Sequence, residues 1–120
     1  MTVKSNRELI VWQKTMEVGQ GCLHVERELP QGRALWPSLI RRAAASVPSN
    51  IAEGQARRST REFVQFISQA EGSLAEVDTQ LLLAVDLGYV TAERITHASE
   101  LVNECQRMLN AMRVKPTTDH

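Results

Sequence analysis

Apolar residues recur every three or four positions along three long segments of this chain, and this spacing constrains the fold more than any other feature. The clearest series lies near the C-terminus and comprises Ile95, Ala98, Val102, Cys105, Leu109 and Met112. Similar series begin at Leu9 and at Phe63. This period places the apolar side chains on one face of an α-helix, whereas a half-buried strand alternates at every second residue. The sequence therefore predicts an all-α protein, and the low aromatic content of 4% also favours helix over strand.

Helix-capping signals mark where three helices begin. Ser5 is followed three residues later by Glu8, the spacing of a capping box, in which a hydroxyl and a carboxylate each accept a hydrogen bond from an unpaired backbone N–H. Ser59 and Glu62 repeat this spacing. Thr91 is a third residue of the type that caps a helix start. We therefore expect one helix to begin beside each of these residues.

Another helix lies between the first two of these, and it contains a proline. Pro37 suits the first turn of a helix and Gly54 suits its end. Pro48 lies inside this segment and lacks the N–H that would bond to the carbonyl four residues earlier. We therefore expect a second helix over residues 37–54 with a kink or a break near Pro48. The helix after it should be the longest and should end near Gly88.

Short connections between four helices favour an antiparallel, up-and-down four-helix bundle, because consecutive helices must then lie side by side and run in opposite directions. With 120 residues, of which 42% are apolar, the chain suits a single domain over residues 1–120 with an ordered core over about 7–113. An alternative is an open array of helices that other subunits complete. This alternative stays open because apolar residues fall on more than one helix face, and these are Leu82, Leu83, Val85, Leu101 and Met108.

Two features carry expectations about packing. The first helix has an apolar stripe that we assign to the core, formed by Leu9, Trp12, Met16, Gly19 and Leu23 and widened by Val11, Val18, Cys22 and Val25. Gly72 lies in the middle of the third helix, where a glycine costs about 1 kcal/mol relative to alanine. That cost predicts a close approach by another helix at Gly72 and Ser73.

The sequence carries no recognised enzyme signature. It has no HExxH, no CxxC, no glycine-rich phosphate loop and no nucleophile elbow, and His24, His97 and His120 fall on different elements. Cys22 and Cys105 each fall on an apolar stripe. We therefore expect buried free thiols, no metal site, no cofactor and no enzymatic activity. No stretch approaches the ~18 apolar residues of a membrane span, so we expect a cytoplasmic protein with no membrane partner.

The formal charge is zero, but it is distributed unevenly along the chain. Residues 33–61 carry six arginines and a single acid, Glu53, whereas residues 62–104 carry eight acids and a single arginine. A guanidinium binds phosphate oxygens bidentately, so clustered arginines can hold a nucleic-acid backbone without reading its sequence. The alternative is ion pairing within the chain or between subunits. The candidate residues are Arg41, Arg42, Arg57, Arg58 and Arg61.

Asn50 and Glu53 lie three residues apart, so on a helix they share a face and could line a polar cleft. One interpretation is structural: the two side chains bond the backbone near Pro48 or bridge to Arg57. The other is contact with a ligand or a partner.

Five groups of residues form a recognisable pattern between about residues 9 and 112, and the run from Arg41 to Gly54 is the most specific of them. The other four are Val11-Trp12-Gln13-Lys14, Arg58-Ser59 with Glu62-Phe63, Gly72-Ser73-Leu74 with Glu76, and Leu87-Gly88-Tyr89. In these residues the sequence resembles the four-helix-bundle proteins encoded by intervening sequences in bacterial 23S ribosomal RNA genes. The chain departs from the family pattern shortly before the double arginine, where it has Leu39 in place of a polar residue.

The resemblance implies a four-helix bundle that assembles into a ring, most often a homopentamer. It also implies a relation to the accessory subunit of diversity-generating retroelements, which is thought to bind nucleic acid through basic surfaces and to partner a reverse transcriptase. The matched residues that would carry such a role are Arg41, Arg42, Asn50, Glu53, Arg57 and Arg58. The leading hypothesis is therefore a non-enzymatic, ring-forming protein that binds RNA or DNA. The alternative is a structural or protein-interaction module that binds no nucleic acid.

Overall fold

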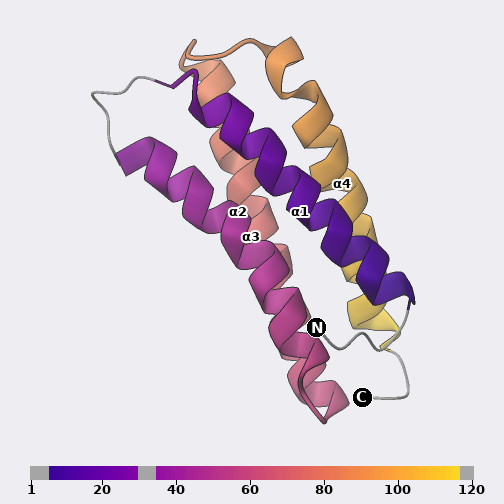
Figure 1. The fold of residues 1–120 in the computed structure, drawn as a ribbon. Helices are drawn as coiled ribbons and strands as arrows, with labels where there is room; N and C mark the ends of the chain where they lie inside the picture. Colours follow the sequence, from indigo (N-terminus) through magenta and orange to yellow (C-terminus); the bar gives the residue numbers. More distant parts are fainter. Residues whose placement is uncertain (1–5, 30–34, 117–120) are drawn as a thin grey trace.

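Four helices account for most of the chain (Figure 1). The computed structural model describes residues 6–29 and 35–116, and over these ranges it contains no strand. The helices are α1 (Asn6–Glu26), α2 (Leu35–Gln55), α3 (Thr60–Asp86) and α4 (Ala92–Val114). The all-α prediction is confirmed, and α3, with 27 residues, is the longest helix of the described chain, as expected. No described helix is both long enough and apolar enough to cross a membrane.

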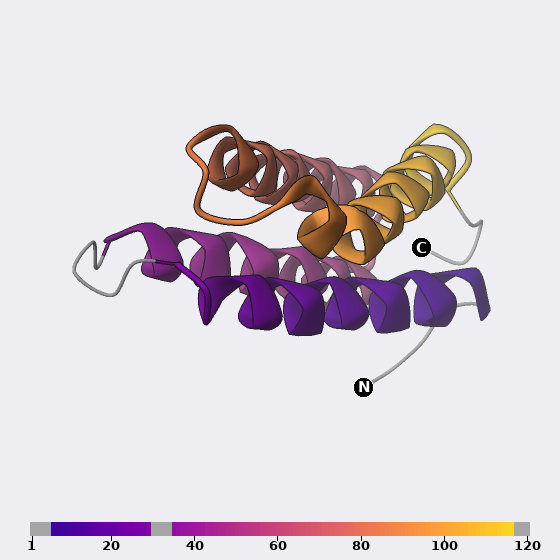
Figure 2. The same cartoon turned by 90° about the horizontal axis from the view of Figure 1, so that it is seen from above.

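The helices form a closed four-membered bundle. α1 packs against α2 and α4, and α3 packs against the same two helices. Viewed from above, α1 and α2 form one layer and α3 and α4 form the other (Figure 2). The chain turns back on itself after each helix (Figure 1), in keeping with the up-and-down order expected from short connections. The α1–α2 pair and the α3–α4 pair therefore present opposite sides of the molecule.

Local side-chain contacts fix the starts of α3 and α4. The Ser59 hydroxyl accepts a hydrogen bond from the Glu62 N–H at 3.2 Å and donates one to the Glu62 carboxylate at 2.9 Å. The Thr91 hydroxyl accepts from the Arg94 N–H at 3.2 Å. Both caps were expected from the sequence, whereas the predicted cap at Ser5 lies outside the described residues.

The turn between α3 and α4 ends α3 in a defined way. Tyr89 N–H donates to the Ala84 carbonyl at 3.0 Å, and Gly88 N–H donates to the Val85 carbonyl at 2.9 Å. This pair of bonds is a Schellman motif, which requires a left-handed residue, and Gly88 has a φ of +77°. The predicted end of the third helix at Leu87 and Gly88 is therefore confirmed.

The core is a single cluster of aliphatic side chains with one buried aromatic ring, Phe63. α4 buries the whole series predicted for it. The series predicted for α3 was Phe63, Phe66, Ala70, Ser73, Val77, Leu81 and Ala84, and it was wrong at two positions: Phe66 and Ser73 are half-buried, and Ile67 and Leu74 are buried instead. Each buried apolar side chain contributes about 1.5–3 kcal/mol to folding, so these two helices provide much of the stability of the bundle. The buried members on α3 are Phe63, Ile67, Ala70, Leu74, Val77, Leu81 and Ala84.

The stripe that α1 buries differs from the one predicted. Met16 and Leu23, which we assigned to the core, are 43% and 45% exposed. Trp12 packs against the core from a half-buried position. The residues expected only to widen the stripe are the buried ones: Val11, Val18, Cys22 and Val25. The prediction was wrong because two apolar stripes run side by side on α1, and the positions of α2 and α4 decide which one is covered.

α2 continues through Pro48 as one helix, so the predicted break is wrong, while a kink at this position stays a prediction. Side chains next to the proline bond to backbone carbonyls in its vicinity. The Ser49 hydroxyl donates to the Ala45 carbonyl at 2.8 Å, and the Asn50 amide donates to the Ser46 carbonyl at 2.9 Å. These two side chains supply hydrogen-bond donors to carbonyls in the turn where proline removes a backbone donor.

Close helix approaches occur at glycines other than the one predicted. A methyl group built on Gly72 would meet no atom within 4 Å, and Gly72 is exposed. The predicted packing notch at Gly72 is therefore wrong for the isolated subunit. A methyl group on Gly21 would lie 3.2 Å from Ala98 Cβ of α4, and one on Gly54 would lie 3.2 Å from Phe66 Cβ of α3. The α1–α4 and α2–α3 contacts therefore depend on these two glycines.

Candidate functional site

Three of the five candidate arginines lie together at the turn between α2 and α3. Arg57 donates to the Glu53 carboxylate at 2.7 Å, and its guanidinium lies 4.6 Å from the centre of the Phe66 ring. Arg58 and Arg61 are exposed, and neither forms an ion pair with any residue that the structure describes. The turn therefore presents two unpaired guanidinium groups beside one that is held in place.

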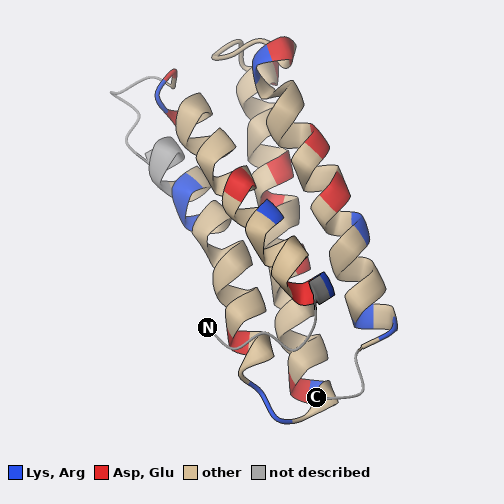
Figure 3. Cartoon of the chain, turned by 45° about the vertical axis from the view of Figure 1, so that its right-hand side comes forward, with Lys and Arg blue, Asp and Glu red and all other residues tan. Residues whose placement is uncertain are grey.

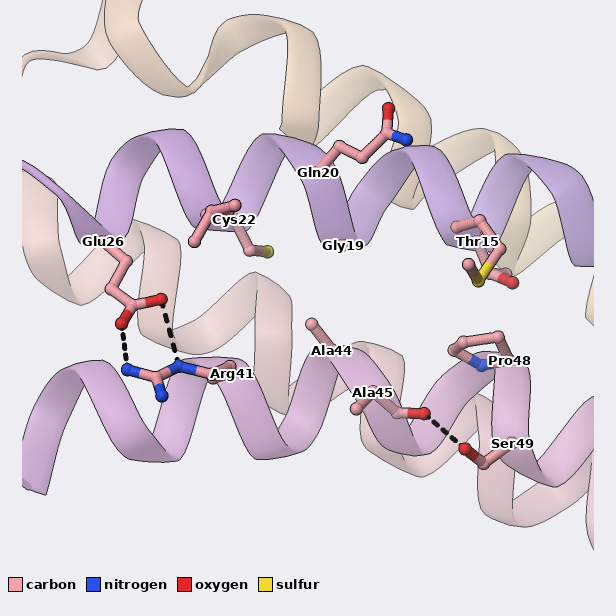
Figure 4. A pocket seen from close by; sticks show the side chains of 12 residues that line it. Thr15, Gly19, Gln20, Cys22, Glu26, Arg41, Ala44, Ala45, Pro48 and Ser49 are labelled. Carbon is pink, nitrogen blue, oxygen red and sulfur yellow. Dashed lines mark hydrogen bonds and ion pairs between the residues drawn. The ribbon is translucent and has the colours of Figure 1, made fainter.

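The other two candidates, Arg41 and Arg42, lie nearer the start of α2. The Arg41 guanidinium spans the gap to α1 and donates to both carboxylate oxygens of Glu26 (Figure 4). This hydrogen-bonded pair raises the pKa of Arg41. Arg42 is exposed and has no ion pair within the described part of the chain. Arg41 thus links two helices, and Arg42 is the free cation of this pair.

The arginines that cluster in the sequence are divided between two places in the structure. Arg41 lies fourteen positions before Gln55, the last residue of α2, which corresponds to about 21 Å along the helix axis, and Arg57 lies in the turn beyond Gln55. Figure 3 shows one basic segment near the start of α2 and another at the turn that follows it. Because sequence proximity along a straight helix is not proximity in space, a single nucleic-acid contact of a few nucleotides would not engage both places on one subunit.

Asn50 and Glu53 face different surroundings, and no hydrogen bond joins their side chains. The half-buried Asn50 amide also donates to the Ser46 hydroxyl at 3.0 Å, and that hydroxyl lies 2.8 Å from the Ser73 hydroxyl of α3. Glu53 is exposed and paired with Arg57. Asn50 therefore belongs to a polar contact between α2 and α3, and Glu53 orients an arginine at the turn.

An apolar groove with a volume of about 510 Å³ lies between α1 and α2. Its α1 wall carries Met16, Gly19 and Leu23, and its α2 wall carries Ala45 and Pro48. The Arg41–Glu26 pair closes one end (Figure 4). This groove was not predicted from the sequence, although the α1 wall of the groove is the stripe that we assigned to the core.

Both cysteines and two of the three histidines fall within the described residues. Among the described residues, no three His, Cys, Asp or Glu side chains lie close enough to share a metal ion. Cys22 and Cys105 are buried free thiols, as predicted, and burial raises the pKa of each to about 11. His24 and His97 border the same small hollow between α1 and α4, while His120 lies outside the described residues. A thiol with so high a pKa is a poor nucleophile at neutral pH.

Comparison with known proteins identifies the family. The model of the 23S rRNA-intervening sequence proteins matches residues 7–111. A crystal structure of a protein of unknown function from the S23 ribosomal protein family of Bacteroides thetaiotaomicron is similar, with a TM-score of 0.79 at 21% sequence identity. The similarity covers 86% of this chain and 97% of that chain. No curated protein matches. The chain therefore belongs to the 23S rRNA-intervening sequence protein family.

Proposed function

We propose that this chain forms a non-enzymatic homo-oligomeric ring that binds the phosphate backbone of nucleic acid through the turn between α2 and α3. The observation that carries the proposal is the exposure of Arg58 and Arg61 at one end of the bundle, with no ion pair to any described residue. An unpaired guanidinium is free to bind phosphate oxygens, whereas a paired one must first lose its carboxylate. The site therefore consists of these two residues, supported by Arg57.

Assembly would multiply this small site. Two arginines on one subunit give a weak contact, but a ring places the same turn of every subunit on one rim, and simultaneous contacts raise the overall affinity. Five subunits is the number that the family resemblance implies. Contacts of this kind read the charge of the backbone and not the bases, so the protein should bind RNA and DNA with little sequence preference.

Two further parts of the proposal concern location and partner. Buried, unpaired cysteines suit a reducing compartment, which supports a cytoplasmic location. A reverse transcriptase partner rests on the family resemblance alone.

The alternative function is a protein-interaction module without nucleic-acid binding, and the apolar groove between α1 and α2 favours it. Exposed apolar hollows of this size on a small domain commonly mark contact surfaces for other proteins. Self-assembly is common to both functions, so binding of nucleic acid is the property that distinguishes them.

The test is the salt dependence of binding to mixed-sequence RNA and DNA. We expect the double variant Arg58→Ala, Arg61→Ala to bind more weakly and to show a flatter slope of log affinity against log salt, by about one for each lost phosphate contact. The matched control replaces with alanine two other exposed basic residues that have no ion pair among the described residues and do not border the α1–α2 groove, Arg107 and Lys115. The proposal would be contradicted if the intact oligomer bound neither RNA nor DNA at low salt. It would also be contradicted if both double variants lost the same amount of affinity.

A further inference from the structure

The α1–α2 groove is an apolar surface open to solvent. Its walls are apolar over most of their length, and the Met16 and Leu23 side chains on them are 43% and 45% exposed. Gly19 leaves the floor between them open, since a methyl group there would meet no atom within 4 Å. A volume of about 510 Å³ is far larger than the ~30 Å³ that one water molecule occupies, so it admits several side chains.

The outer face of α3 has the complementary character. Gly72, Ala75 and Thr79 lie opposite the buried face of the helix and border a shallow hollow of about 260 Å³. Leu83 continues the same face one turn later and is 42% exposed, with Leu82 beside it at 54%. Small residues let a second backbone approach closely, and leucines supply side chains to insert. This face therefore combines a shallow recess with an apolar ridge.

The charges beside the two surfaces are opposite in sign. Arg27 and Arg42 directly follow Glu26 and Arg41, the pair that closes one end of the groove, and both are exposed. Glu76 and Asp86 are exposed on α3. None of these four residues forms an ion pair with another described residue. Glu26, the acid that lines the groove, is already paired with Arg41, and a second copy of this chain offers both an apolar ridge and unpaired acids.

We infer that the α1–α2 groove of one subunit receives the outer face of α3 from a second copy of this chain, with Leu82 and Leu83 inserted into the groove. The two surfaces belong to opposite layers of the bundle (Figure 2), so one subunit can use both at once. Such a head-to-tail contact joins different surfaces and closes into a ring when the rotation between subunits permits. The inference rests on the proposed self-assembly and is independent of nucleic-acid binding.

The contact explains two observations that the isolated subunit does not. It covers the exposed stripe of α1, which would otherwise leave Met16 and Leu23 in water. It also supplies the close helix approach that a glycine at position 72 suggests, because the recess at Gly72 would face a neighbouring subunit. Both features are then explained by one interface.

The test uses one charged substitution on each surface. We expect Leu23→Asp and Leu83→Asp each to convert the assembled protein into monomers at micromolar concentration, measured by light scattering. An equimolar mixture of the two variants should form a one-to-one dimer that grows no further, because each variant retains the surface that the other has lost. The control Ile10→Asp alters an α1 residue of matching exposure, 44%, that does not border the groove, and should assemble as the wild type does.

Several outcomes would overturn the inference while leaving the proposed self-assembly intact. These are assembly of both variants as wild type, loss of assembly in Leu23→Asp alone, and failure of the mixture to form the dimer. A monomeric wild-type protein would instead refute self-assembly itself, and nucleic-acid binding is measured separately. Circular dichroism checks folding, and Ala45→Glu on the groove and Thr79→Glu on α3 replace either variant that does not fold.

Discussion

Alanine substitutions at Gly54 and Gly72 should change stability in opposite directions. In Gly72→Ala the new methyl group meets no atom within 4 Å, so the substitution gains helix propensity, about 1 kcal/mol in the free energy of unfolding. In Gly54→Ala the new Cβ would lie 3.2 Å from Phe66 Cβ and 3.4 Å from Phe63 Cδ1. The Phe66 Cβ is bonded to the α3 backbone and cannot rotate away, so α2 and α3 must separate slightly.

Overpacking of this kind costs about 1–3 kcal/mol, which exceeds the gain in propensity near the end of α2. We therefore expect Gly54→Ala to lower the free energy of unfolding by about 1 kcal/mol and to differ from Gly72→Ala by about 2 kcal/mol. Urea unfolding followed by circular dichroism measures both. The comparison is made in the Leu23→Asp background, which should be monomeric, so that only packing within the subunit differs. Equal stabilisation by the two substitutions would refute the close approach at Gly54.

Three other predictions follow from burial and hydrogen bonding. In urea unfolding, Leu74→Ala should cost about 2–5 kcal/mol and Leu23→Ala less than about 1 kcal/mol, because only Leu74 is fully buried. Burial raises the thiol pKa of Cys22 and Cys105 from 9.0 to about 11, so native protein should resist alkylation at neutral pH until it unfolds. Since the folded pKa is the higher one, the contribution of the two thiols to stability is complete below pH 9.0 and is lost as the pH rises to about 11. Replacing both cysteines with alanine should therefore make the free energy of unfolding fall less steeply between pH 9.0 and about 11. Asn50→Ala should cost about 1 kcal/mol in the same assay, and Asn50→Asp, which cannot donate to the helix carbonyl, should not restore it.

The number, type and limits of the helices could be predicted from the sequence. Ser59 and Thr91 cap helices because each hydroxyl accepts a hydrogen bond from the N–H three residues later. Gly88 ends α3 because it is the residue of that turn that adopts a positive φ. The apolar series of α4 also identified its buried face correctly, and that of α3 did so except that Ile67 and Leu74 are buried where Phe66 and Ser73 were expected. All of these signals act within one or two helical turns, so the neighbouring residues are enough to determine the outcome.

The ion pairing of the candidate arginines could not be predicted from local sequence signals. Arg41 and Arg57 are near in sequence, but Arg41 lies within α2 and Arg57 in the turn that follows it, and their partners Glu26 and Glu53 come from different helices. The sequence could nominate the arginines, because guanidinium chemistry is local to each residue. Which of them would be left unpaired required the positions of the acids on the packed helices.

Local sequence signals are enough to predict four amphipathic helices and the caps of α3 and α4. The side of each helix that is covered depends instead on how the helices pack. Met16 and Val18 are both apolar and both belong to helical stripes on α1, yet Val18 is fully buried and Met16 lines an open groove. The physical reason is that burial depends on the approach of α2 and α4, whose side chains lie far away in the sequence and cover one stripe at the expense of the other.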